Sequence, residues 1–298
     1  MSYLKKYQLD FLELTVYLVN VLRHHLPEGE KILRAWQIID QGIGQMIKEF
    51  PQASWLIFSD HGSGEIKVKF NINQWLKNEG YLVLKNNQKD FQKSFWLKMG
   101  LHQGNLSKIA ARLGLKDFLK KHFARFKFVV PSASGAVGKT AKEALIDWQK
   151  SQAVASGQGP IYLNKLQITN NKSQNLREEI IKKLERLEYN GVKIAKKVYQ
   201  KEEIYAGEFM AKAPDLVIDQ GEGAHISGGL GFKDIFSAPQ KWLGENQKTG
   251  IFLAVGPCFT ANHLSSASIL DIAPTILRIF GLKKSNDLDG RVLNEIIK

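Results

Sequence analysis

Residues 54–62 read SWLIFSDHG, and this stretch decides the fold class that the sequence predicts. The apolar run 54–58, bounded by Pro51 and a glycine-rich loop, is typical of a buried strand that ends in a loop. In open α/β sheets, functional residues follow the carboxyl ends of the strands. Asp60 and His61 can there offer a carboxylate oxygen and an imidazole nitrogen to one divalent metal ion. The alternative is a turn aspartate beside a hydrogen-bonding histidine, and the stretch alone does not decide between them.

The preceding segments extend this interpretation. Residues 13–20 are rich in β-branched and aromatic side chains and predict a strand, whereas residues 31–50 have apolar side chains at helical spacing. Strand, helix and strand in this order predict a right-handed βαβ unit with parallel strands. The polar residues that such a unit brings to one edge of the sheet are Asn20, His24, Asp60 and His61.

The rest of the chain alternates in the same way. It predicts an α/β fold with a mostly parallel sheet flanked by helices. A core segment, 1–85, contains the metal corner, a helical cap is inserted at 86–160, and residues 161–298 complete the core. The further elements that patterning predicts are helices at 73–80, 176–187 and 268–280 and strands at 192–199, 214–218 and 251–255.

Composition narrows the class of protein. The length of 298 residues suffices for one large α/β domain or two smaller ones. A single cysteine, Cys258, excludes an internal disulfide framework, and we expect a cytoplasmic protein. No stretch predicts a signal peptide or a membrane span. The net charge is +13, but the basic residues are dispersed, which favours a solvated lysine-rich surface over nucleic-acid binding.

Several short motifs occur in an order that resembles the type I phosphodiesterase/nucleotide pyrophosphatase branch of the alkaline phosphatase superfamily. Their joint order is more specific than any one of them. They are SDHG at 59–62, NQWL at 73–76, DW at 147–148, GPIYLN at 159–164, APDL at 213–216, GIF at 250–252 with GP at 256–257, DIAPT at 271–275 and DGRVL at 289–293.

The resemblance implies a hydrolase that holds two divalent metal ions, zinc or manganese, and attacks a phosphoester with a Thr or Ser nucleophile. Two metal ions can stabilise the attacking and leaving oxygens of an in-line displacement. Asp60 and His61 match two ligands of the metal that activates the nucleophile. His24 matches the histidine of an Asp-x-x-x-His pair that binds the other metal. The implied substrate is a small phosphate ester.

The chain departs from the family pattern at two ligand positions. Asn20 stands where the family pair has aspartate, and Asn246 stands where the family has a late histidine. The family's N-terminal strands, which carry another Asp ligand and the nucleophile, find no match in the chain, so we expect them to be missing. A neutral amide oxygen is a weaker ligand than a carboxylate or an imidazole, and transition-metal sites use about three or four strong ligands. We therefore expect weak metal binding.

Three functions stay open at this point. The first is a phosphodiesterase-type hydrolase that is inactive as an isolated chain. The second is a non-catalytic remnant or binding module, which the two asparagines favour. The third is one half of a split hydrolase, in which a separate N-terminal polypeptide supplies the nucleophile.

Other residues offer competing interpretations. Residues 133–140, ASGAVGKT, resemble a phosphate-binding P-loop that ends in Gly138-Lys139-Thr140, and the alternative is a surface loop. Asp215 is interpreted as a turn residue and Asp271 as a helix N-cap. Three further histidines, His25, His225 and His263, are candidate substitute metal ligands. Three tryptophans, Trp75, Trp148 and Trp242, are candidate core aromatics or base-stacking platforms.

Overall fold

The computed structural model describes residues 9–26, 28–85, 145–168, 170–264 and 266–298. The chain divides into two compact units. Unit 1 comprises Met1–Glu65 and Gln240–Lys298, and unit 2 comprises Ile66–Pro239. Each unit mixes helices and strands, so the α/β class is confirmed.

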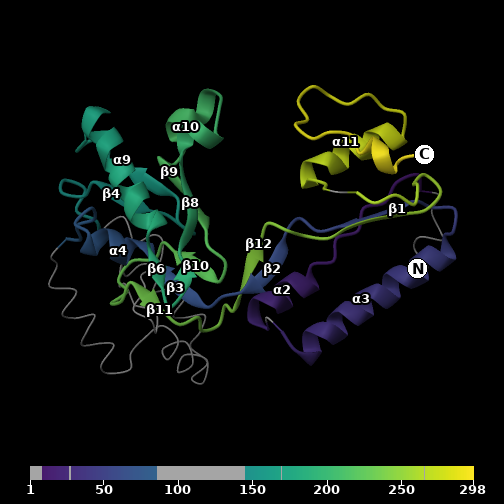
Figure 1. The fold of residues 1–298 in the computed structure, drawn as a ribbon, viewed down its shortest axis with the longest axis horizontal. Helices are drawn as coiled ribbons and strands as arrows, with labels where there is room; N and C mark the ends of the chain where they lie inside the picture. The colour runs from purple at the N-terminus through teal and green to yellow at the C-terminus, as the bar shows by residue number, and fades with distance from the viewer. Residues whose placement is uncertain (1–8, 27, 86–144, 169, 265) are drawn as a thin grey trace, which may run out of the picture. The chain divides into compact units, whose positions relative to one another are not determined.

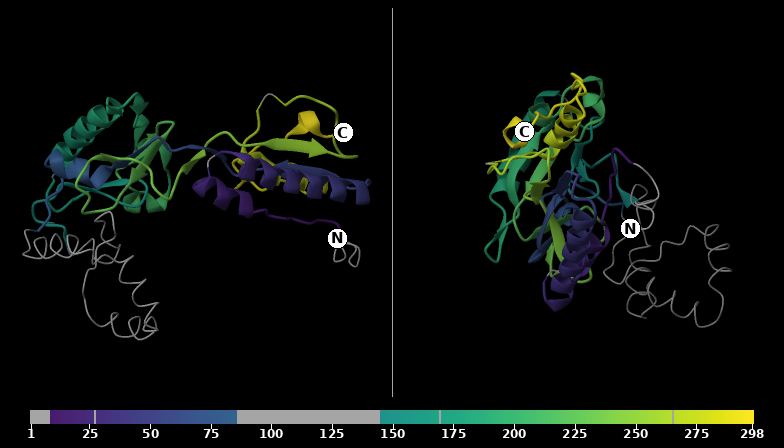
Figure 2. Two further views of the ribbon diagram at one scale, coloured as in Figure 1. Left: turned by 90° about the horizontal axis from the view of Figure 1, so that it is seen from below. Right: turned by 90° about the vertical axis from the view of Figure 1, so that its right-hand side faces the viewer.

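Unit 1 is built on two short antiparallel ladders. β1 pairs with β13, and β2 pairs with β12. Figure 2 shows α3 as one uninterrupted helix. The elements of unit 1 are α2 (Leu18–His25), α3 (Glu30–Glu49), β1 (Trp55–Phe58), β2 (Gly62–Glu65), β12 (Gly244–Gln247), β13 (Phe252–Val255), η2 (Ile269–Asp271), α11 (Ile272–Ile279) and η3 (Asn294–Ile296) (Figure 1).

One face of the β1–β13 ladder carries the small core of unit 1. Leu56, Phe252 and Ala254 pack against a buried cluster. Because side chains alternate along a strand, the neighbours of these residues point to the opposite face. There Leu253 and Val255 are exposed. The buried cluster consists of Phe259, Leu293 and Ile296.

Unit 2 has two larger sheets. Strands β4, β5, β9 and β8 form a four-stranded antiparallel sheet, and β10, β3 and β11 form a three-stranded sheet. Its elements are β3 (Val68–Asn71), α4 (Ile72–Asn78), β4 (Ala153–Ala155), β5 (Ile161–Leu163), α9 (Asn170–Glu185), β6 (Glu188–Tyr189), β7 (Val192–Lys193), β8 (Ala195–Gln200), α10 (Lys201–Ile204), η1 (Glu208–Lys212), β9 (Leu216–Gln220), β10 (Ala224–Ser227) and β11 (Phe236–Ser237).

A single large hydrophobic core holds unit 2 together. It joins both sheets to α4 and α9. The side chains of Phe70, Leu76, Ile161, Ile180 and Leu216 are fully buried in it. Burial of this kind is the main favourable contribution to folding.

The expected mostly parallel sheet is wrong for the described residues. Among them, only β10 and β3 pair in parallel, and the other named ladders are antiparallel. The strand expected at 13–20 is also wrong, because helix α2 begins at Leu18. The predicted βαβ unit therefore does not form, and β1 takes its partner from 252–255. An apolar run predicts a buried strand but does not encode the direction of its partner.

Most other elements form where periodicity places them. Helix α3 covers the helix predicted at 31–50, and α4 ends before Gly80, whose φ of +83° suits a glycine helix stop. Of the expected cap at 86–160, residues 86–144 lie outside the described residues. Residues 153–155 form β4, a strand of the unit 2 sheet. None of the helices in the described part of the chain has the length and apolar character that a membrane crossing needs.

Candidate metal corner

The candidate corner is the bend at 59–61, which joins the two ladders of unit 1. On one side Phe58 of β1 lies opposite Phe252 of β13. On the other side Gly62 of β2 lies opposite Gln247 of β12. The same two chain segments therefore enclose the bend, and β2 and β12 lie side by side next to it (Figure 1).

Two glycines allow the backbones to approach at this bend. A Cβ atom on Gly62 would overlap the carbonyl oxygen of Thr249, and one on Gly250 would overlap Oγ of Ser59. That hydroxyl oxygen accepts the N–H of Ile251 at 2.9 Å, and the Ser59 N–H donates to the Ile251 carbonyl at 3.1 Å. The glycines in the SDHG and GIF motifs are thus required by the close backbone contact.

The imidazole of His61 is oriented by the first residue of β2, which follows it. Its Nδ1–H donates to the carbonyl oxygen of Gly62 at 2.8 Å, so that Nε2 carries the lone pair of the neutral ring. The side chain is 22% exposed. A backbone carbonyl on one ring nitrogen is a common way to orient a histidine whose other nitrogen binds a metal.

Asp60 lies beside this ring. Its Oδ1 is 3.7 Å from His61 Nε2. This separation is shorter than the sum of one Zn–N and one Zn–O bond, about 4.1 Å, so one ion can reach both atoms. The Asp60 side chain is 80% exposed, which leaves the carboxylate open to solvent. The two side chains are therefore close enough to serve as two ligands of one ion, and their assignment as metal ligands stays a prediction.

His24 is held at the end of α2 against the start of β12. Its Nδ1–H donates to the carbonyl oxygen of Gly244 at 2.8 Å. The ring stacks on Trp242 with centroids 3.7 Å apart, and the residue is only 9% exposed. The Leu243 N–H also donates to the His24 carbonyl at 2.7 Å. Trp242 thus packs on a candidate ligand.

The two asparagines lie on the elements that carry the other candidate residues. Asn20 precedes His24 by one helical turn on α2, which places both on one helix face. Asn246 lies on β12 opposite Ser63 of β2, close in sequence to Gly244, which accepts from His24. The structure therefore brings α2, β12 and β2 together around these positions.

The described residues do not complete a metal site. No group of three or more His, Cys, Asp or Glu side chains with metal-binding geometry occurs among them. A tetrahedral zinc site needs three or four protein ligands, and the corner supplies two. The implied metal pair therefore does not fit the residues that this part of the chain brings together.

The substitute histidines do not change this result. His25 donates from Nδ1 to the Lys241 carbonyl at 2.7 Å, and His225 lies in unit 2 on β10. The His263 N–H donates to the side chain of the neighbouring Asn262. None joins the corner as a third ligand within the described residues.

Two aspartates make contacts beyond those that the sequence predicted. Asp271 was expected to cap a helix, and it stands at the N-cap position of α11, although its side chain makes no capping hydrogen bond to that helix. Its Oδ2 instead accepts the Ser268 N–H at 2.9 Å in the capping box that begins η2, and its Oδ1 accepts the Arg291 N–H at 2.8 Å. It thereby ties the DIAPT motif to the DGRVL motif. Asp215 was expected to be a turn residue, but it is 3% exposed and pairs with Arg177 and Lys201.

The sequence around Asp215 has no local pattern that shows two distant cations converging on its carboxylate. The preceding Pro214 was the one local sign that the backbone there is constrained. The three tryptophans differ in burial. Trp75 is buried in the core of unit 2, whereas Trp148 and Trp242 are partly exposed. The P-loop-like stretch with Gly138, Lys139 and Thr140 lies outside the described residues.

Comparison with known proteins identifies the family. Residues 3–244 match the model of the family described as type I phosphodiesterase/nucleotide pyrophosphatase. No curated protein and no solved structure matches the chain significantly. The match covers most of the chain and contains the SDHG, NQWL and APDL motifs. The chain therefore belongs to the type I phosphodiesterase/nucleotide pyrophosphatase family, a branch of the alkaline phosphatase superfamily.

Proposed function

We propose that this chain is a phosphodiesterase-type family member that does not turn over phosphoesters by itself. The family is generally metal-dependent and acts on small phosphoester molecules. The observation that carries the proposal is the Asp60–His61 corner, which has two strong ligands and no third among the described residues. A non-catalytic role in holding a phosphoester is therefore favoured over hydrolysis.

The chemistry of the two asparagines supports the proposed lack of turnover. A carboxylate or an imidazole donates a lone pair strongly to zinc, whereas an amide oxygen is neutral and a weak ligand. With Asn20 and Asn246 in these positions, His24 is the one strong ligand left of the set that the family resemblance assigns to the second metal. Without a fixed metal pair, the developing charge of an in-line displacement has no Lewis acid to stabilise it.

A direct assay tests the proposal. The full chain is incubated with a nitrophenyl phosphodiester and added zinc or manganese, with His61→Ala as the matched variant. We expect the same background rate for both proteins. Turnover by the wild type that disappears in His61→Ala would refute the proposal.

Restoring the family ligands gives a complementary test. The double variant Asn20→Asp, Asn246→His should bind zinc more tightly than the wild type, because it adds two strong ligands beside His24. Gln247→His is the control, because it adds a histidine at the next position of β12, on the opposite face of the strand. Equal zinc affinity in the double variant and the control would show that positions 20 and 246, assigned from the family resemblance, do not converge on a metal ion.

A second candidate is a hydrolase assembled from two polypeptides. The exposed apolar face of unit 1 favours it, because Leu253 and Val255 on β13 lie open to solvent. In that case, chain purified from its native cells is active on the phosphodiester and the recombinant chain is not. Absence of activity in both preparations would exclude this candidate.

A further inference from the structure

Unit 2 contains a cavity that shares no residue with the metal corner. Its volume is about 270 Å³, and it lies between the first half of α9 and the ends of β5 and β8. We call it the Arg177 pocket. It is lined by Leu163, Lys165, Ile168, Ser173, Arg177, Lys201 and Asp215.

Three of the four charged side chains that line the Arg177 pocket are largely buried, whereas Lys165 is exposed. Side-chain exposure is 13% for Arg177, 10% for Lys201 and 4% for Asp215. Removing charges from water is costly unless they are paired and hydrogen-bonded. The pairing within this cluster therefore decides what the pocket can accept.

Asp215 satisfies the two cations only in part. Its Oδ2 accepts the Leu163 N–H at 2.8 Å. Its Oδ1 is shared between Lys201 Nζ at 3.2 Å and Arg177 Nη2 at 3.3 Å. Charge-assisted N–H···O bonds are typically about 2.7–2.9 Å long, so both cations are held loosely by one oxygen.

Arg177 has a buried donor that no described group accepts. Its Nη1 donates to Glu202 at 3.3 Å and to Gln200 at 3.4 Å, which are again long contacts. Its Nε is buried, and no hydrogen-bond partner for it occurs in the described part of the chain. A buried guanidinium N–H without an acceptor is destabilising and calls for an explanation.

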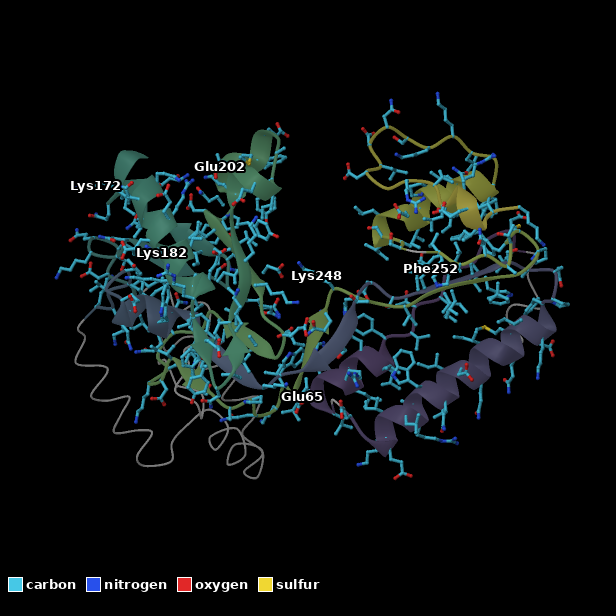
Figure 3. All side chains as sticks on the ribbon, in the orientation of Figure 1. Glu65, Lys172, Lys182, Glu202, Lys248 and Phe252 are labelled. Atoms are coloured by element: carbon cyan, nitrogen blue, oxygen red, sulfur yellow. The ribbon has the colours of Figure 1, made fainter. Side chains whose placement is uncertain are left out.

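The lining has an excess of positive charge. Lys165, Arg177 and Lys201 are cationic, and Asp215 is the one carboxylate among the lining residues. Ser173 lies one helical turn before Arg177 on α9 and adds a hydroxyl donor on the same helix face. Glu202 pairs with Arg177 from α10, where its side chain is half exposed (Figure 3).

We propose that the Arg177 pocket binds a phosphate group, either as inorganic phosphate or as part of a small phosphate monoester. Phosphate oxygens accept hydrogen bonds from the lysine ammonium groups and from the guanidinium group, whose contacts with Asp215, Glu202 and Gln200 are all long. Arginine is well suited to a planar, two-pronged contact with phosphate. The volume of the pocket admits the phosphate group together with a small organic part. The proposal does not rest on the function proposed for the metal corner.

Calorimetry of the full chain tests this assignment. The protein is treated with chelator and dialysed, so that no metal ion at the Asp60–His61 corner can bind phosphate, and is then titrated with inorganic phosphate or with glycerol phosphate. Saturable binding of either ligand is expected, and the tighter one identifies the source of the phosphate group. Folded wild-type protein that binds neither ligand would overturn the proposal.

Three variants locate the binding. Arg177→Lys keeps a charge near Asp215 but removes the guanidinium, and should weaken binding about tenfold. Lys165→Gln removes a lining charge for which no ion pair is seen among the described residues, and should weaken binding about threefold without unfolding the chain. Lys172→Gln, on α9 but outside the pocket lining, is the matched control and should bind as wild type (Figure 3).

Circular dichroism shows whether each variant is folded. If folded Lys165→Gln and Lys172→Gln bind phosphate with the same affinity as wild type, the phosphate lies elsewhere and the proposal is wrong. Lys165→Gln removes no buried ion pair of the described residues, so we expect it to fold. The comparison of Lys165→Gln with Lys172→Gln therefore still tests the proposal if Arg177→Lys fails to fold.

Discussion

The two units of this chain differ in how completely they bury their own apolar residues. In unit 2, two sheets share one core with α4 and α9. In unit 1, the β1–β13 ladder packs against a cluster of Phe259, Leu293 and Ile296, and apolar side chains of β13 remain exposed. The candidate metal residues lie in unit 1, whereas the buried ion cluster around Asp215 lies in unit 2. The unit that contains the candidate metal residues is therefore the one with less packing of its own.

Core truncation should show the largest difference between the units. Phe70→Ala in unit 2 removes a fully buried ring and should cost about 4 kcal/mol of unfolding free energy. Phe58→Ala in unit 1 removes a ring that is 40% exposed and should cost about 1 kcal/mol, because less area leaves water on folding. Urea denaturation measures both, and equal costs would contradict the comparison.

Hydrogen exchange compares the two long helices directly. Helix α9 buries Leu176, Ile180 and Leu184, whereas Ile32 is the one buried residue of α3. Because exchange follows local opening, central amides of α9 should exchange at least about a hundredfold more slowly than those of α3. Similar protection in the two helices would show that α3 is packed as firmly as α9, which would contradict the difference in burial between the two units.

The bend at the corner should be sensitive to added bulk. Gly62→Ala places a Cβ against the Thr249 carbonyl and should cost about 2 kcal/mol. Gly42→Ala, in open space within α3, should instead stabilise by about 0.5–1 kcal/mol through helix propensity. Thermal unfolding of both variants tests this, and a neutral Gly62→Ala would mean that the ladders separate freely there.

The smallest expected effect is a pH dependence in unit 2. Hydrogen bonds from Lys183 and Tyr81 hold the pKa of Glu179 below its usual value of 4.5. A carboxyl with a lowered pKa stabilises the fold above its unfolded pKa, and this contribution is lost as the pH falls through the folded pKa. Stability should therefore fall below about pH 4.5 less steeply in Glu179→Gln than in wild type.

Titration of the unfolding midpoint from neutral pH to pH 3 measures this difference. The change in slope should be small because Glu179 is half exposed and screened by solvent. Glu178→Gln, the neighbouring carboxylate on α9, is the control. Identical slopes in Glu179→Gln and wild type would contradict the assigned role of the Lys183 contact.

Local periodicity was sufficient to predict much of the secondary structure. The spacing of apolar residues predicted α3, and the run 54–58 predicted β1. Strand direction was not predictable in this way, because a buried strand has the same pattern whether its partner is parallel or antiparallel. Residues 13–20 predicted a strand, although α2 begins within them. A short apolar run does not by itself distinguish a strand from a buried helix.

The site was predictable only where its residues are neighbours in sequence. The side chains of Asp60 and His61 lie 3.7 Å apart, and their role as metal ligands stays a prediction. The contact of His24 with Gly244, 220 residues away, and the convergence of Arg177 and Lys201 on Asp215 depend on tertiary structure. Such long-range contacts have no signature in one sequence, because many pairings satisfy the same local pattern.

Zinc binding by the full chain tests the central claim most directly, namely that the corner has two strong ligands and lacks a complete set. In calorimetric titration of metal-free wild type, we expect weak heats that do not saturate at one zinc per chain and that fall further in His61→Ala. Tight binding with a 1:1 endpoint that is lost in His61→Ala would contradict the account.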